Sequence, residues 1–131
     1  MSFLQNALDL NSKRLSIYAG SLPHTSPETQ AFFAASTEAW TVGLRHTLDN
    51  LENIIVSPFT LGDQISLADL HMMAWLARVV SAAGGKMDKE GIDVLEVKIG
   101  NKWKVGEKIS TYWEAALDRP SFRKVYESGL H

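Results

Sequence analysis

Residues 62–80 read GDQISLADLHMMAWLARVV, and this stretch restricts the possible fold more than any other. From Leu67 onward, apolar side chains occupy nearly every side of the predicted helix, which is typical of a helix in a protein core. Water cannot satisfy the free N–H groups at a buried helix start, so the chain must do so internally. Ser66 and Asp69 have the spacing of a capping box, in which the Ser66 hydroxyl accepts from the Asp69 N–H and the Asp69 carboxylate accepts from the Ser66 N–H. We therefore expect a buried central helix over residues 67–83 whose first N–H groups are satisfied by the capping box.

The rest of the chain also has helical periodicity. Apolar residues recur every three to four positions in four further segments, residues 2–19, 27–55, 106–118 and 120–126. Gly43 lies inside the long second segment, where it can allow the close approach of a neighbouring helix. No segment alternates in the manner of a strand. The prediction is an all-α fold, a helical bundle of five to six helices in a single domain spanning residues 1–131.

Residues 84–105 are harder to assign. Within them, residues 86–103 mix charges of both signs with scattered apolar side chains, which predicts a short, poorly packed helix or an ordered loop with a solvated surface. Trp103, at the end of this segment, can either plug the bundle or mark a binding surface.

The composition excludes several classes of function. The chain has no Cys, which removes a disulfide framework, a thiolate metal site and a cysteine nucleophile. The formal net charge of −2 argues against a nucleic-acid partner. No apolar run reaches the roughly 18 residues of a membrane span, and the N-terminus lacks the pattern of a signal peptide. We expect a cytoplasmic protein with neither a nucleic-acid nor a membrane partner.

Two motifs together resemble the C-terminal helical domain of the glutathione transferases. LGDQISLADLHMMAWL, residues 61–76, resembles the capped buried helix start of that domain. YWEAALDRPSFRKVY, residues 112–126, resembles its aromatic helix, Arg-Pro-Ser junction and terminal helix. The order of elements also fits, so the resemblance covers most of the chain, least securely residues 84–105. Gly106 departs from the family pattern, in which Pro often starts this helix.

The resemblance implies separate roles for two domains. In the family, an N-terminal thioredoxin-like domain binds glutathione and supplies the catalytic residue, while the helical domain supplies most of the hydrophobic co-substrate pocket. This sequence has no βαβ pattern, so we expect no catalytic residue and no cofactor in this chain, with glutathione bound only if a thioredoxin-like domain is supplied.

Two functions follow from that division, and both stay open. The chain is either a non-catalytic module that binds proteins or hydrophobic ligands, or the co-substrate-binding half of a transferase whose catalytic domain is absent from this chain. The partners that this implies are a second copy of the chain, a thioredoxin-like domain or a small hydrophobic ligand.

One group of candidate ligand contacts lies on the central helix. His71, Trp75 and Arg78 have i, i+4, i+7 spacing and therefore share one face of an otherwise apolar helix. Arg78 can hold an anion there, and Trp75 can stack on an apolar ligand. The alternative is that this face meets solvent or the neighbouring helices, with Arg78 paired to a carboxylate, since long charged side chains often cover apolar surface.

A second group lies on the first helix. Asn11, Arg14 and Tyr18 occupy its polar edge or its end. In the glutathione transferases this helix lines the cleft and often the dimer interface, so these side chains are candidates for ligand contact. Simple solvation is the alternative.

His46 and Asp49 are candidates for a metal site. Their i, i+3 spacing can place both side chains on one ion. A site needs a third and a fourth ligand, and the sequence offers no evident cluster. We therefore predict no metal site.

Overall fold

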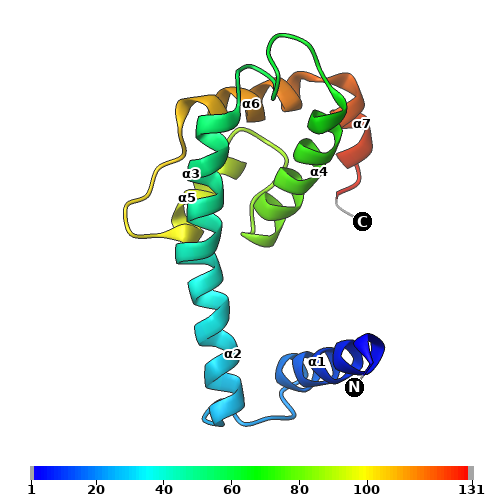
Figure 1. Ribbon diagram of the computed structural model, residues 1–131, viewed down its shortest axis with the longest axis vertical. Coiled ribbons are helices and arrows are strands. Elements are labelled where there is room, and N and C mark those ends of the chain that lie inside the picture. Colours follow the sequence, from blue (N-terminus) through cyan, green and yellow to red (C-terminus); the bar gives the residue numbers. More distant parts are fainter. Residues whose placement is uncertain (1, 130–131) are drawn as a thin grey trace. The chain divides into compact units, whose positions relative to one another are not determined.

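The computed structural model describes residues 2–129, which form helices joined by turns and loops without a strand (Figure 1). In chain order the elements are α1 (Phe3–Tyr18), α2 (Pro27–Glu38), the π-helical segment η1 (Ala39–Leu44), α3 (Arg45–Ile54), α4 (Leu67–Ala82), α5 (Gly91–Ile99), α6 (Glu107–Asp118) and α7 (Pro120–Tyr126). The all-α prediction is confirmed. Within the described residues no helix is both long and apolar enough to cross a membrane.

Contacts divide the chain into two compact units, one up to Ala39 and one from Trp40 onward. The assignment of residues 1–131 to one domain stays a prediction.

The first unit contains α1 and α2. The Ser2 hydroxyl accepts from the N–H of Gln5 at 3.2 Å at the start of α1, and the Ser26 hydroxyl does the same for Thr29 at the start of α2. Gly20, at a φ of +71°, follows α1 in the left-handed conformation expected there. Within residues 2–39, three leucines of the α1 stripe stay exposed, namely Leu4, Leu8 and Leu15.

The long helix predicted over residues 27–55 starts at Pro27 as expected, but it is not regular throughout. Residues 39–44 adopt π-helical turns between α2 and α3. Gly43 lies in this segment, and a Cβ atom there would meet nothing within 4 Å. The expectation of a close helix approach at Gly43 is therefore wrong. An interior Gly weakens the regular helix, which fits its place in an irregular segment.

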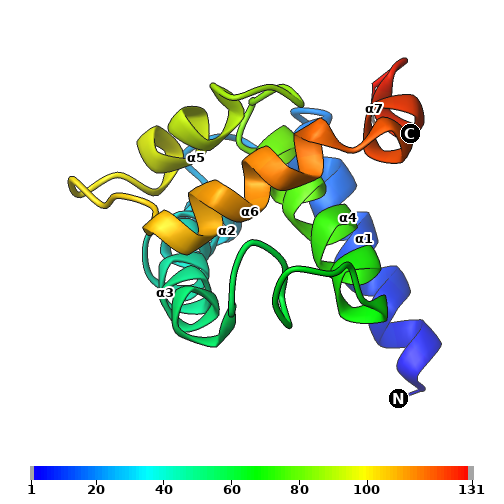
Figure 2. The ribbon, with the colours of Figure 1, turned by 90° about the horizontal axis from the view of Figure 1, so that it is seen from above.

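The second unit has its core where α4, α5 and α6 meet. In both ribbon views α6 lies across the ends of α3 and α4 (Figures 1 and 2). The buried hydrophobic side chains of these three helices are Met73, Leu76, Ala77, Val80, Ile92, Leu95, Ile99, Ile109, Tyr112, Trp113 and Ala116. The expectation that α4 is buried all round is wrong in its first turn, where Leu67 is 72% exposed and Leu70 is 59% exposed. The buried residues of α4 are Asp69, Met73, Leu76, Ala77 and Val80.

Ser66 and Asp69 form the capping box that the sequence predicts at the start of α4. The Asp69 carboxylate accepts from the Ser66 N–H at 2.8 Å and from the Ser66 hydroxyl at 2.9 Å. Its other oxygen accepts from the N–H of Thr60 at 2.9 Å and from the Thr60 hydroxyl. The hydroxyl of Ser66 thus donates to the carboxylate, and the Asp69 N–H donates to the Ser66 carbonyl oxygen at 3.1 Å. Asp69 is completely buried, so these contacts replace its lost hydration.

The charge at this position is stabilised by its neighbours. Burial by itself raises the pKa of Asp69, but the hydrogen bonds from Thr60 and Ser66 outweigh it and lower the pKa to about 2. Tyr112 of α6 donates from its hydroxyl to the Asp69 carbonyl oxygen at 3.4 Å. Burial and the nearby Asp69 charge raise the pKa of Tyr112 well above its ordinary value. The start of α4 is therefore tied both to the 55–66 loop and to α6.

Residues 84–105 differ from the expectation. They contain the helix α5, whose Ile92, Leu95 and Ile99 are buried, so the prediction of poor packing is wrong. Trp103 is also buried, which favours its interpretation as a plug. The sequence misled because the charges of this segment lie on the solvent side or bind backbone groups. Glu96, for example, accepts from the Val105 N–H at 3.0 Å.

Glu52 of α3 caps the start of α6 from a distance in sequence. Its two carboxylate oxygens accept from the N–H groups of Lys108 and Ile109, each at 2.9 Å. A carboxylate at a helix N-terminus satisfies free donors and opposes the positive end of the helix dipole. A Cβ atom at Gly106 would overlap this carboxylate, so the contact needs Gly at this position.

Replacing Asp69 by Asn should lower the free energy of unfolding most at neutral pH. The folded pKa of about 2 lies below the unfolded value of about 3.9, so the charged form contributes about 2 kcal/mol above pH 4. This contribution is lost as the pH falls through 4 to 2. Urea unfolding should therefore show that Asp69→Asn has a lower free energy of unfolding than wild type at pH 7, and that this difference is smaller at pH 2.5. An equal difference at both pH values would contradict the lowered pKa of Asp69.

Replacing Ser66 by Ala should lower the free energy of unfolding by less, about 1 kcal/mol.

Gly106→Ala should destabilise the second unit by about 2 kcal/mol, because the new methyl group displaces the Glu52 carboxylate from the start of α6. The matched control is Gly43→Ala, which adds the same methyl group in open space and should be neutral or stabilising by up to about 1 kcal/mol. Thermal unfolding of the two variants measures the difference. Equal unfolding midpoints for Gly106→Ala and Gly43→Ala would show that the position of the Glu52 carboxylate does not require Gly at position 106.

Candidate functional site

An open apolar groove runs between α3 and α4 in the second unit. Its volume is about 430 Å³, and six side chains line it, namely Thr47, Leu51, Ala68, His71, Met72 and Trp75. The exposed lining is mostly apolar. The groove is shallow, so it is suited to side chains laid across it more than to a fully enclosed small molecule.

Helical spacing places the lining residues. Thr47 and Leu51 are four apart on α3, and His71 and Trp75 are four apart on α4, so each pair forms a continuous row on its helix. The two helices cross at a steep angle, since α3 is seen end-on in Figure 2 while α4 extends across that view. The row on α4 is extended by Leu67 before His71 and by Arg78 after Trp75. The outer edge of the groove on α4 is thus apolar at one end and cationic at the other.

The structure brings together two of the three candidate residues of the central helix. His71 is exposed and Trp75 is half-buried against the core, and both line the groove. Arg78 is exposed and lies one turn beyond the lining. Arg78 has no ion-pair partner within residues 2–129, so the sequence-based alternative of a structural ion pair is not observed there.

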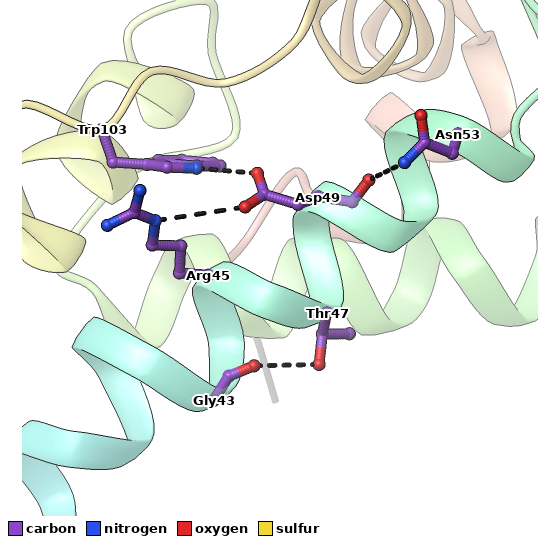
Figure 3. Close-up of polar contacts among 6 residues, drawn as sticks. All are labelled: Gly43, Arg45, Thr47, Asp49, Asn53 and Trp103. Carbon is purple, nitrogen blue, oxygen red and sulfur yellow. Dashed lines mark hydrogen bonds and ion pairs between the residues drawn. The ribbon is translucent and has the colours of Figure 1, made fainter.

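The acidic side chains of α3 face away from the groove, as Figure 3 shows for Asp49. One Asp49 oxygen accepts from the indole N–H of Trp103 at 2.9 Å, and the other lies 4.0 Å from the Nε atom of Arg45 (Figure 3). Glu52 is bound to the start of α6. Both carboxylates of α3 therefore hold the 103–109 segment, and neither reaches the groove.

The same contacts involve Asp49, one of the two residues considered for a metal. Asp49 is already bound to Trp103 and Arg45 (Figure 3). Across residues 2–129 no group of three or more His, Cys, Asp or Glu side chains is arranged to hold a metal ion.

A second cavity lies between α1 and α2 in the first unit. It has a volume of about 660 Å³ and is mostly apolar, with Leu10, Ile17, Leu22 and Phe32 among its lining residues. Of the three candidates on the first helix, Arg14 lines this cavity. Tyr18 packs edge-on against Phe32 with a ring separation of 5.7 Å. Asn11 is exposed and is not part of the lining.

Sequence reasoning missed the α3 half of the groove. Thr47 and Leu51 read as ordinary positions of an amphipathic helix, and nothing local shows that they face His71 and Trp75. The carboxylate contacts were also missed, because Asp49 and Trp103 are 54 residues apart and Glu52 and Ile109 are 57 apart. Only the tertiary pairing of α3 with α6 reveals which face of α3 is left for binding.

Comparisons of the chain with protein-family models, with curated proteins and with solved structures found no match.

Proposed function

We propose that the chain is a non-catalytic binding module that uses the α3–α4 groove to hold apolar side chains of a partner protein. The observation that carries this proposal is the groove itself, with the half-buried ring of Trp75 in its wall and few polar atoms in its lining. Aromatic side chains in partly desolvated grooves contribute disproportionately to protein association. The shallow, open shape favours a protein surface over an enclosed small ligand.

The kinship to the C-terminal domain of glutathione transferases is part of this proposal. It is supported by the capping box at Ser66 and Asp69 and by the α6–Pro120–α7 junction, which occur where the resemblance places them. A helical domain of this kind without its thioredoxin-like partner has no group to activate the thiol of glutathione. Cytoplasmic localisation remains part of the same proposal.

One observation favours the second candidate function, the co-substrate-binding half of a transferase. The cavity between α1 and α2 is larger than the groove, apolar, and contains Arg14. Its volume lies in the range of small-molecule sites. In this alternative the cavity binds a hydrophobic co-substrate, and a thioredoxin-like domain on another chain supplies glutathione.

The groove should bind an apolar fluorescent dye such as a naphthalene sulfonate. Trp75→Ala removes the ring that walls the groove, and Ala68→Gln places a larger polar side chain at an exposed lining position without opening the core. Each variant should weaken dye binding about tenfold, as measured by fluorescence titration. The control is Trp40→Ala, which removes a half-buried ring outside the groove. Unchanged dye binding in both groove variants would refute the assignment.

The purified chain should not conjugate glutathione to an electrophilic aryl halide above the rate in buffer. The reason is that the proposed kinship leaves the glutathione-activating residue on a different domain. The assay follows absorbance of the conjugate at saturating glutathione. Turnover that is abolished by a substitution in this chain would overturn the non-catalytic proposal. Turnover that appears only after a thioredoxin-like domain is added would favour the second candidate.

A further inference from the structure

The charges around the α3–α4 groove are one-sided. α4 contains a single acidic residue, Asp69, which is buried and bound to Thr60 and Ser66. α3 contains two, Asp49 and Glu52, which bind the 103–109 segment on the far side of that helix. Neither helix therefore offers a carboxylate to the groove.

The groove edge carries basic and neutral groups instead. On α4, His71 and Arg78 are exposed and lie in the same row as Trp75. On α3, the exposed side chains next to Thr47 are His46 and Asn50. Arg78 is a cation that has no ion-pair partner in the described part of the chain. This edge is cationic although the chain as a whole has a formal charge of −2.

Shape limits the partner further. An open groove between two helices accepts a third helix, whose apolar side chains lie in the groove at i, i+3, i+4 and i+7 spacing. The exposed apolar residues Ile54 and Leu67 extend the apolar surface beyond the lining at one end, and Arg78 marks the other. A helix that crosses the groove therefore meets apolar surface along its length and a cation near one end.

We infer that the partner bound in this groove is an acidic amphipathic helix, which lays an apolar face over Leu51, Met72 and Trp75 and sets a carboxylate against Arg78. The inference rests on the proposed function and deepens it by naming the chemistry of the partner. Charge complementarity of this kind selects partners and speeds association. A basic helix with the same apolar face is rejected by Arg78.

The test uses two fluorescein-labelled helical peptides of 16 residues. Both carry Leu at i, i+3, i+4 and i+7 positions, with Glu on the flanks of one and Lys on the flanks of the other. Fluorescence anisotropy with the full chain should show the Glu peptide binding at least about tenfold more tightly. Arg78→Glu should abolish this preference. Lys102→Glu makes the same charge change at an exposed loop cation outside the groove lining and should leave the preference intact within about twofold.

The outcomes separate the inference from the function on which it rests. Equal binding of the two peptides, weakened in both by Ala68→Gln, would overturn the acidic partner and leave the groove function standing. Dye binding without peptide binding would overturn the helical partner alone. Loss of both dye and peptide binding would overturn the proposed function as well. Self-association that Ala68→Gln abolishes and the Glu peptide fails to displace, measured by sedimentation velocity, would assign the groove to a second copy of the chain and overturn the inference.

Discussion

The buried carboxylate of Asp69 is the contact on which the second unit depends. It accepts hydrogen bonds from Ser66, at the start of α4, and from Thr60, in the loop before it. The backbone carbonyl of the same residue accepts from Tyr112 of α6. A charged group without water has to be satisfied completely, so its partners are held in fixed positions. One side chain thus fixes the start of the central helix, the path of the loop and the placement of α6.

With α6 fixed, the orientation of α3 follows. Glu52 accepts from the first N–H groups of α6, and Asp49 accepts from the indole of Trp103. These two contacts turn one side of α3 toward the 103–109 segment. The opposite side, with Thr47 and Leu51, is left beside α4 and becomes a wall of the groove. Because Asp49 and Glu52 are bound to the 103–109 segment, they leave the groove side of α3 without a carboxylate.

The distribution of charge around the groove links the fold to the proposed function. A binding surface gains specificity when its apolar floor is combined with a charge of one sign at its edge. Here the floor is supplied by Leu51, Met72 and Trp75, and the edge by His71 and Arg78. Because the acids of α3 and α4 are occupied in holding the unit together, the cationic edge is not neutralised from within.

The sequence by itself determined the helical class, most helix limits and the capped start of α4, because these depend on local spacing. The Ser66–Asp69 box, the Ser26 cap and the α7 segment from Pro120 to Tyr126 all involve residues a few positions apart. The sequence also placed His71 and Trp75 on one face. Only the tertiary structure decided what lies opposite that face, that residues 91–99 form a packed helix, and that Gly106 makes room for Glu52. The physical reason is that these contacts join different helices, with Glu52 lying 57 residues from Ile109, and no periodicity within either helix encodes the identity of its neighbour.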